Sequence, residues 1–491
     1  MTNIASTTAL TTIRHAFAWL ALLVAFVSTV AGTVVAAESD AARPNIVLII
    51  SDDQAYTDFG FMGHPLVRTP ELDRLASEAV LFRNGYVPSS VCRPSLVSIL
   101  TGLYPHQHHI YFNHPPPGFR ELTQLRSKAE FDRLRQLAAG RIRSLPSLPR
   151  LLGELGYRSL QTGKYWEGHW RQAGFTEGMT IAEPSAGGGR LGDKQLPSGE
   201  WVAHGNGDHG LAIGRETMAP IERFLAAEDD RPFFLWYAPF LPHSPHDAPQ
   251  RYERLYEHNE TPIHQRKYFA SISQFDDTVG KLMALLDRSG KRDNTVVVFV
   301  VDNGWVAAEK AKADGSFDHT RRSKRAPFDD GLRTPIFFWQ PRRFAAQRRD
   351  NLVSSVDLAP TLLRLAGYPV ERLSAPLPGV DLVPQLRGEQ SVNDPSCANR
   401  SVFGEIYPGD ATALGNPAGD IAYRWVRNGP WKLIAVHAQG GSAPWNGYLA
   451  GDAVYRVDRD PNERRNLIRD EPDRAARLRR ELDDWWLPVA R

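Results

Sequence analysis

The feature that most constrains the fold is a set of short apolar runs, each bounded by polar turn residues. The clearest run is TVVVFVV at residues 295–301, and similar runs occupy residues 46–50, 157–162, 233–237 and 335–339. Such runs are typical of strands that are buried on both faces of a parallel sheet. Segments with helical spacing of apolar residues lie between them, at 71–80, 145–155, 217–226 and 265–286. This alternation predicts an α/β domain over residues 42–388, with a large, mostly parallel sheet flanked by helices.

The composition changes after Gly388. A polar, turn-rich stretch is followed by short strand-like runs at residues 401–404, 422–427, 431–436 and 453–456. A charged segment with helical spacing covers residues 471–486. We therefore expect residues 389–491 to form a smaller C-terminal α+β domain.

Residues 1–37 resemble a targeting segment. A basic residue, Arg14, precedes a long apolar run that is interrupted at Gly32 and ends in Ala36 and Ala37, and no acidic residue occurs before Glu38. This pattern predicts a signal peptide that is cleaved before Glu38. A membrane anchor is the alternative, because the run is about 20 residues long. We expect an exported protein, periplasmic or secreted, with no stable membrane span after signal removal.

Charge and cysteine content exclude several classes of protein. The 58 Lys and Arg residues nearly balance the 56 Asp and Glu residues, which gives a formal net charge of +2. No global basic field therefore favours a nucleic-acid partner. The two cysteines, Cys92 and Cys397, are too few for a disulfide framework or for a four-cysteine zinc site in one chain.

Polar side chains follow the predicted strands at the point where each strand ends. Open α/β sheets bind ligands at the carboxyl ends of their strands, so these residues are candidates for a common site. They are Asp52 and Asp53 after the first strand, Lys164 and His169 after the second, His243 after the third, and Asp302 and Asn303 after the fourth.

Three of these residues are carboxylates and one is an amide. Asp52, Asp53, Asp302 and Asn303 offer hard oxygen ligands, which suit Ca²⁺, or less well Mg²⁺, rather than zinc. Ordinary turn chemistry is the alternative, because Asp and Asn are common in turns. Since each pair directly follows an apolar strand, we favour a metal site.

Cys92 precedes a short apolar segment with helical features. Pro94 can occupy a first helical turn, and Gly102 lies beyond the end of the segment. Unpaired N–H groups at a helix start favour an anion, so we expect a reactive thiol at this position. The alternative is a buried structural thiol.

Together these residues resemble the sulfatase family of the alkaline-phosphatase superfamily. The run Cys92-Arg93-Pro94-Ser95-Leu96, followed by Thr101-Gly102, is similar to the family signature C-x-P-S-R and T-G. Further family segments are matched, in order, by NIVLIISDD, GYRSLQTGK, PFFLWYAPFLPHSP, VVDNG, SKRAPFDDGLRTP, SVDLAPTLLRLAG and YRVDRDPNERRNL. The resemblance implies an alkaline-phosphatase-like fold.

The resemblance also implies a chemistry. Cys92 would be oxidised to formylglycine by a formylglycine-generating enzyme, a transient partner, and the aldehyde hydrate would attack the sulfur of a sulfate monoester. The substrate would be a sulfated small molecule or polysaccharide. The implied roles are metal binding for Asp52, Asp53, modified Cys92, Asp302 and Asn303, charge neutralisation for Lys164 and Lys324, leaving-group protonation for His243 or Lys324, and base catalysis for His169.

Two positions depart from the family pattern. The arginine expected four residues after the cysteine is Leu96, and the histidine expected two residues after Lys164 is Trp166. We expect His169 to take the place of that histidine. Two other functions stay open at this point: a phosphoester or phosphonate hydrolase with the same fold, and an inactive sulfatase-like protein that binds glycans. The leaving alcohol and the oligomeric state have no readable sequence code.

Overall fold

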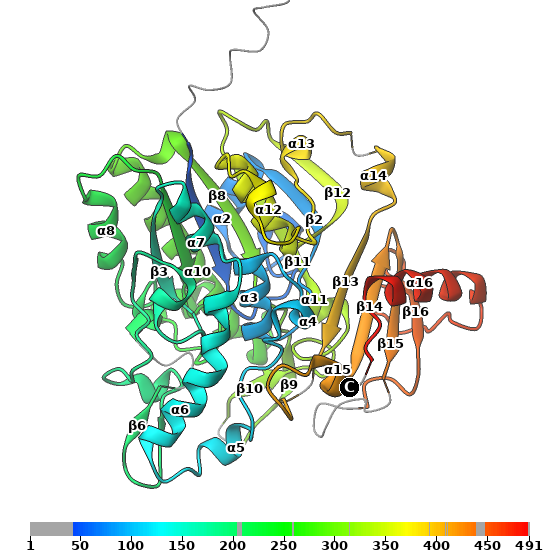
Figure 1. Cartoon of the computed structure of the whole chain (residues 1–491), viewed down its shortest axis with the longest axis horizontal. Coiled ribbons are helices and arrows are strands. Elements are labelled where there is room, and N and C mark those ends of the chain that lie inside the picture. The colour runs from blue at the N-terminus through cyan, green and yellow to red at the C-terminus, as the bar shows by residue number, and fades with distance from the viewer. Residues whose placement is uncertain are drawn as a thin grey trace, which may run out of the picture. The chain divides into compact units, whose positions relative to one another are not determined.

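An eight-stranded sheet forms the centre of the fold, with the strand order β12-β2-β11-β8-β1-β7-β3-β4 (Figure 1). All neighbouring strands are parallel except those that pair with β11. The predicted α/β fold with a mostly parallel sheet is therefore confirmed. The strands are β1 (Asn45–Ser51), β2 (Val80–Tyr86), β3 (Arg158–Gly163), β4 (Glu177–Gly178), β7 (Phe233–Ala238), β8 (Thr295–Val301), β11 (Arg333–Trp339) and β12 (Gln347–Ser354).

The computed structural model describes residues 43–203, 209–257, 260–313, 315–391, 393–407, 409, 411–437 and 447–489. The predicted signal peptide, residues 1–37, lies outside this part of the chain. Among the described residues, no helix combines the length and the apolar character that crossing a membrane requires.

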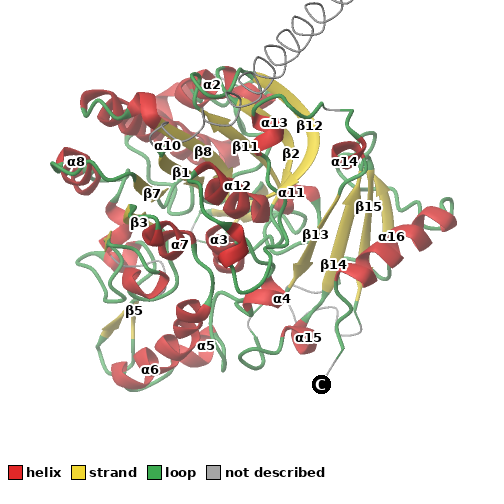
Figure 2. Ribbon diagram, turned by 45° about the horizontal axis from the view of Figure 1, so that its top comes forward, coloured by secondary structure: helices red, strands yellow, loops and turns green. Residues whose placement is uncertain are grey.

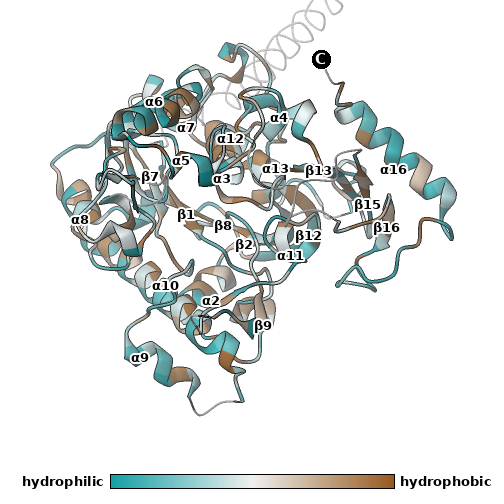
Figure 3. Ribbon diagram, turned by 90° about the horizontal axis from the view of Figure 1, so that it is seen from below, coloured by the Kyte–Doolittle hydropathy of each residue, from teal (hydrophilic) through white to brown (hydrophobic). Residues whose placement is uncertain are grey.

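Helices cover both faces of the sheet, and the pleat of β1 explains why. Ile46, Leu48 and Ile50 point into one core cluster, whereas Val47 and Ile49 point into a second cluster on the opposite face. Figure 3 shows the apolar strands enclosed between helices whose outer surfaces are hydrophilic. The first face is covered by α3 (Cys92–Thr101), α7 (Leu148–Glu154) and α12 (Leu358–Leu365), and the second by α2 (Pro70–Ser77), α8 (Ala219–Ala226) and α10 (Ile263–Arg288).

Two long strands were not predicted. The helix expected over residues 71–80 ends at Ser77, and Val80 begins β2. The sequence of β2, VLFRNGY, has only three apolar residues before a turn-like RNG, and β12, QRRDNLVS, begins with polar residues. Neither strand forms a continuous apolar run, since β12 is the edge strand and β2 is exposed at Arg83.

A separate four-stranded antiparallel sheet follows near the C-terminus, in the order β13-β14-β15-β16 (Figure 2). Leu478 and Leu482 of α16 (Pro472–Trp485) pack against Leu433 of this sheet. The predicted small C-terminal α+β part is therefore present. Its strands are β13 (Ser401–Ile406), β14 (Tyr423–Asn428), β15 (Trp431–Val436) and β16 (Ala453–Arg456).

Shorter elements complete the fold. The helices are α4 (Pro105–His108), α5 (Phe119–Leu122), α6 (Lys128–Ala139), α9 (Gln250–Glu253), α11 (Asp329–Leu332), α13 (Val383–Leu386), α14 (Pro395–Ala398) and α15 (Pro417–Asp420). The strands are β5 (Lys194–Gln195), β6 (Trp201–Val202), β9 (Ala307–Ala311) and β10 (Phe317–His319).

Candidate active site

The register of the sheet brings two pairs of oxygen-bearing residues together. In the parallel pair formed by β1 and β8, Ser51 lies opposite Val301, so the residues that follow each strand leave the same edge side by side. The backbone N–H of Asp53 donates to Asp302 Oδ1 at 3.1 Å. Asn303 Nδ2 donates to Asp53 Oδ1 at 2.7 Å. Residues about 250 positions apart in the chain therefore share one buried cluster.

Two lysines neutralise part of this negative charge. The ammonium group of Lys164 contacts Asp52 Oδ1 and lies 3.2 Å from Asp302 Oδ2. Lys324 donates to Asp53 Oδ2 at 2.6 Å. Burial opposes the charged form of Lys324, but the carboxylate of Asp53 raises the pKa of Lys324 above its ordinary value. Both lysines are therefore ammonium ions at neutral pH.

The antiparallel direction of β11 explains how Lys324 reaches the site. The parallel strands end at the edge of the sheet that carries the cluster, so the residues that follow them lie there. Because β11 runs antiparallel, it begins at this same edge. The segment that precedes β11, and not the one that follows it, therefore contributes to the site.

Two glycines allow the close approach of backbone segments that this cluster requires. A Cβ atom at Gly163, directly before Lys164, would lie 1.9 Å from the carbonyl oxygen of Ala238. A Cβ atom at Gly304, directly after Asn303, would lie 2.0 Å from the carbonyl oxygen of Asp330. The glycines of the sequences TGK and DNG are therefore steric requirements of the site.

Cys92 is the first residue of α3, and its Sγ lies 3.8 Å from Asp53 Oδ1. Burial raises the pKa of the Cys92 thiol to about 12, against the opposing effect of Lys164 and Lys324. Desolvation therefore outweighs the helix start and the two cations at the unmodified residue, and the reactivity of position 92 stays a prediction. The cysteine is positioned at the cluster, but as a protonated thiol.

His243 faces the cluster from the segment after β7. Its Nδ1 lies 2.7 Å from the carbonyl oxygen of Ser244 and therefore donates a hydrogen bond, which leaves Nε2 as an acceptor 3.5 Å from Lys324 Nζ. Burial lowers the pKa of His243 well below its ordinary value, so the ring is neutral. Arg215, which sequence reasoning missed, has a side chain that is only 4% exposed. It holds this segment by donating to the carbonyl oxygens of Phe240 and His243.

The structure does not bring His169 to the cluster. His169 caps the short helix Trp170–Ala173, where its Nδ1 accepts a hydrogen bond from the backbone N–H of Arg171 at 3.2 Å. It lines a separate cavity together with Trp166. Within the described part of the chain, no hydrogen bond or ion pair joins His169 to the carboxylates or lysines of the cluster.

Leu96 and Trp166, the two residues that depart from the family pattern, lie beside each other. Leu96 is buried in the apolar core under the sheet, beside Trp166. Arg93, which follows Cys92, is fully buried and pairs with Glu167 at 2.6 Å. This pair links the start of α3 to the loop after Lys164, and no local motif predicts it, because its members are 74 residues apart.

His319 is a further residue that sequence reasoning missed. It lies on β10, and its pKa is lowered by burial and by the positive charge of Lys324, with Asp53 opposing. His319 Nδ1 lies 3.0 Å from the carbonyl oxygen of Thr320, in the segment that leads to Lys324. The flanking sequence GSFDHT carries no recognisable motif, so only the fold could reveal it.

The donor set fits a divalent cation. Three carboxylates, Asp52, Asp53 and Asp302, face only two ammonium groups. Burial, together with the neighbouring carboxylates and against Lys164, raises the pKa of Asp52 well above its ordinary value. Two buried oxygens, Asp52 Oδ2 and Asn303 Oδ1, have no hydrogen-bond partner among the described residues. Asp52, Asp53, Cys92 and His243 each offer one ligand atom within 4.8 Å of the others. Unpaired buried oxygens in an acidic cluster are suitable ligands for a hard cation.

Comparisons with known proteins agree with this geometry. The family model described as Sulfatase matches residues 44–368. N-acetylgalactosamine-6-sulfatase of Canis lupus familiaris is 29% identical over 79% of this chain and 73% of that protein. Arylsulfatase A of Homo sapiens is 29% identical over 71% of this chain and 68% of that protein.

Solved structures share the fold. The crystal structure of Ps i-CgsB in complex with k-i-k-neocarrahexaose superposes with a TM-score of 0.65 and 22% identity, covering 91% of this chain and 94% of that chain. Since the family model spans well over half of the sequence, the chain belongs to the sulfatase family of sulfuric ester hydrolases.

Proposed function

We propose that this protein hydrolyses a sulfate monoester of a carbohydrate, with a formylglycine made from Cys92 as the nucleophile and a Ca²⁺ ion as the cofactor. One observation carries the proposal. Cys92, two lysines and the oxygen ligands from distant parts of the chain meet in one buried cluster, in which Cys92 Sγ lies 3.8 Å from Asp53 Oδ1.

Asp52, Asp53, Asp302 and Asn303 would hold the ion, together with the modified residue 92. The unpaired oxygens of Asp52 and Asn303 support this assignment. When bound, Ca²⁺ supplies Lewis-acid chemistry, lowering the pKa of the attacking hydroxyl group and neutralising charge on the sulfate. Mg²⁺ is the second choice, because it demands a stricter octahedral geometry.

The pKa of the Cys92 thiol supports a modified nucleophile. A thiol with a pKa of about 12 is protonated at neutral pH and is a poor nucleophile. An aldehyde hydrate presents two hydroxyl groups instead, one to attack sulfur and one to release the sulfate afterwards.

Lys164 and Lys324 have complementary roles in the proposal. Both ammonium groups border the cluster and would neutralise sulfate oxygens as charge develops. Lys324 also carries a proton that His243 Nε2 approaches at 3.5 Å. Because His243 is neutral with its proton on Nδ1, we assign protonation of the leaving oxygen to Lys324 and positioning of its ammonium group to His243.

The carbohydrate substrate is proposed from the relatives. The canine relative is named for N-acetylgalactosamine 6-sulfate, and the similar crystal structure contains a neocarrahexaose. The identity of the sugar and the linkage is left to experiment.

The test combines a mass measurement with kinetics. The protein is produced together with a formylglycine-generating enzyme, and the peptide that contains Cys92 is weighed. Conversion of the thiol to the aldehyde lowers its mass by about 18 Da. We expect conversion and turnover of aryl sulfate that exceeds turnover of aryl phosphate. Dominant phosphatase activity would contradict the proposal, and an unmodified thiol without turnover would favour the inactive glycan-binding alternative.

A further inference from the structure

With Cys92 as an unmodified cysteine, the cluster contains a donor set that is not made of oxygens alone. Cys92 Sγ, a ring nitrogen of His243 and one carboxylate oxygen each from Asp52 and Asp53 lie within 4.8 Å of one another. Zn²⁺ accepts sulfur, nitrogen and carboxylate oxygen as ligands, whereas Ca²⁺ takes oxygen ligands. Before Cys92 is modified, the four side chains therefore have the ligand chemistry of a zinc site.

The spacing of the ligand atoms suits a tetrahedral ion. Zinc bonds of about 2.0–2.3 Å at tetrahedral angles place neighbouring ligand atoms about 3.3–3.8 Å apart. Cys92 Sγ lies 3.8 Å from Asp53 Oδ1, and His243 Nε2 lies 3.3 Å from Asp53 Oδ2. Both separations fall in this range, so the side chains need little rearrangement to close around an ion.

The two lysines of the cluster leave one oxygen of each aspartate available to the ion. Lys164 contacts Asp52 Oδ1, whereas the buried Asp52 Oδ2 has no hydrogen-bond partner among the described residues. Lys324 donates to Asp53 Oδ2, and Asp53 Oδ1 is the oxygen that faces Cys92 Sγ. A buried polar atom without a hydrogen bond costs free energy, which a bound cation recovers.

His243 is held in the way that zinc-binding histidines are held. Its Nδ1 lies 2.7 Å from the carbonyl oxygen of Ser244, so Nδ1 carries the proton and Nε2 is left to a ligand. A hydrogen bond of this kind fixes the tautomer and the orientation of the ring in metal sites. Binding would exchange the 3.5 Å approach of Lys324 Nζ to His243 Nε2 for a metal bond.

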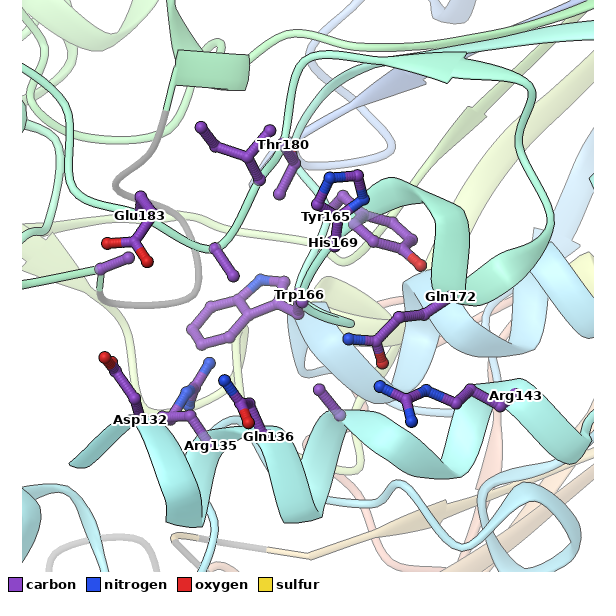
Figure 4. A pocket seen from close by; sticks show the side chains of 15 residues that line it. Asp132, Arg135, Gln136, Arg143, Tyr165, Trp166, His169, Gln172, Thr180 and Glu183 are labelled. Carbon is purple, nitrogen blue, oxygen red and sulfur yellow. The ribbon is translucent and has the colours of Figure 1, made fainter. Parts of the chain in front are cut away.

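His169 does not belong to this set. It lines the separate cavity shown in Figure 4, beside Trp166 and Gln172. Among the described residues, the group that could hold a metal contains His243 as its histidine. The substitution that removes the nitrogen ligand is therefore one at His243.

We propose that the chain with unmodified Cys92 binds one Zn²⁺ ion through Cys92, His243, Asp52 and Asp53, and that conversion of Cys92 to formylglycine removes this site. The ion takes the place of the thiol proton, which passes to solvent. After conversion the sulfur is absent and the remaining donors are mainly oxygens, so the preference changes to a hard cation. The zinc site itself does not depend on the proposed function, and only the change of preference does.

The experiment uses the full-length protein produced without a formylglycine-generating enzyme, and the mass of the Cys92 peptide confirms the thiol. Bound metal is removed with a chelator, and Zn²⁺ or Co²⁺ is then titrated into the protein. Co²⁺ reports the ligand, because a sulfur-to-cobalt charge-transfer band appears only when a thiolate binds it. The variants Cys92→Ala and His243→Gln each remove one ligand, and Cys397→Ala removes the other buried cysteine as the matched control.

We expect one Zn²⁺ per chain and a charge-transfer band with Co²⁺ in the wild type. Cys92→Ala should lose the band and bind Zn²⁺ at least about tenfold more weakly, since the loss of an outer hydrogen bond to a ligand already costs about this factor. His243→Gln should weaken binding by at least about the same factor and keep the band. Cys397→Ala should behave like the wild type.

Three results would overturn the proposal: no bound zinc, no charge-transfer band, or a band that persists in Cys92→Ala. The wild-type band is measured without any substitution, so the proposal stays testable even if a variant fails to fold.

Conversion of Cys92 by coexpression separates the zinc site from the proposed function. The converted protein should lose the band and hydrolyse aryl sulfate. A band before conversion without turnover after it would leave the zinc site standing and refute the proposed catalysis. Turnover after conversion without a band before it would refute the zinc site alone.

Discussion

Arg93 and Glu167 form a doubly hydrogen-bonded ion pair, with distances of 2.6 Å from Nε to Oε1 and 2.7 Å from Nη2 to Oε2. Both side chains are almost completely buried, at 1% and 2% exposure. Arg93 follows Cys92, and Glu167 lies three residues after Lys164, so the pair connects the proposed nucleophile to the loop of a lysine that we propose to bind the sulfate. A third contact, from Arg93 Nη2 to the carbonyl oxygen of Ala138, includes the end of α6.

Breaking this pair on one side should destabilise the protein strongly. Glu167→Ala leaves the Arg93 guanidinium buried without its carboxylate, which costs about 3–5 kcal/mol in the free energy of unfolding. The double variant Arg93→Met with Glu167→Leu should lose less, because it leaves no buried charge. Urea denaturation measures the free energy of unfolding of the wild type, of Glu167→Ala and of the double variant. The exposed pair Arg292–Asp287 supplies the control, and Asp287→Asn should change stability by less than about 1 kcal/mol. A loss at Glu167 as small as this control would contradict the prediction.

Removing one proposed metal ligand should release the ion while the fold is retained. Asp302 contacts the backbone N–H groups of Asp53 and Asn303, so Asp302→Asn keeps an oxygen there but removes a charge. We expect at least about a tenfold loss of calcium affinity and a parallel loss of activity. Calorimetric titration with Ca²⁺ measures the affinity, and circular dichroism checks the fold. Unchanged calcium affinity would show that the ligand assignment is wrong.

Removing the proposed acid should slow reactions with poor leaving groups most. Lys324→Met keeps the length of the side chain but deletes the ammonium group that contacts Asp53. We expect kcat to fall by about 10²-fold or more for aryl sulfates whose phenols have a high pKa, and by less for those whose phenols have a low pKa. Lys281→Met, at an exposed lysine on α10, is the control. A uniform loss across the series would assign Lys324 to charge neutralisation alone.

The strand ends were predictable because local sequence controls them. The runs before Asp52, Asp302 and His243 are continuous and apolar, and the parallel sheet brings their carboxyl ends to one edge. Strands β2 and β12 were not predicted because the apolar run of β2 is short, VLF, and β12 begins with the polar residues QRRDN. Both pair with strands that are distant in the sequence. The pair Arg93–Glu167 and the placement of His319 depend on tertiary packing, and no local sequence rule encodes either.

The two sheets are joined by a buried ionic cluster that the sequence also did not predict. Lys432 of β15 lies 2.8 Å from Asp329 and 2.9 Å from Glu463. The backbone N–H of Asp329 donates to Glu463 at 2.6 Å, and Tyr86 of β2 donates to Asp329 at 2.7 Å. Because Asp329 lies five residues after Lys324, the C-terminal sheet also supports the segment that carries Lys324 to the candidate active site.

This cluster should make stability depend on pH through Glu463. Burial raises the pKa of Glu463 from 4.5 to about 7, although Lys432 opposes the shift. Between these two values the folded protein holds a proton that the unfolded chain releases, so the free energy of unfolding falls as pH rises through this window. Glu463→Gln lacks the ionisation and should lose less stability between about pH 5 and about pH 8, by on the order of 3 kcal/mol at most. Urea denaturation at both pH values measures the difference, with the exposed Glu222→Gln as the control. Equal pH dependence in Glu463→Gln and wild type would show that Glu463 is ionised throughout.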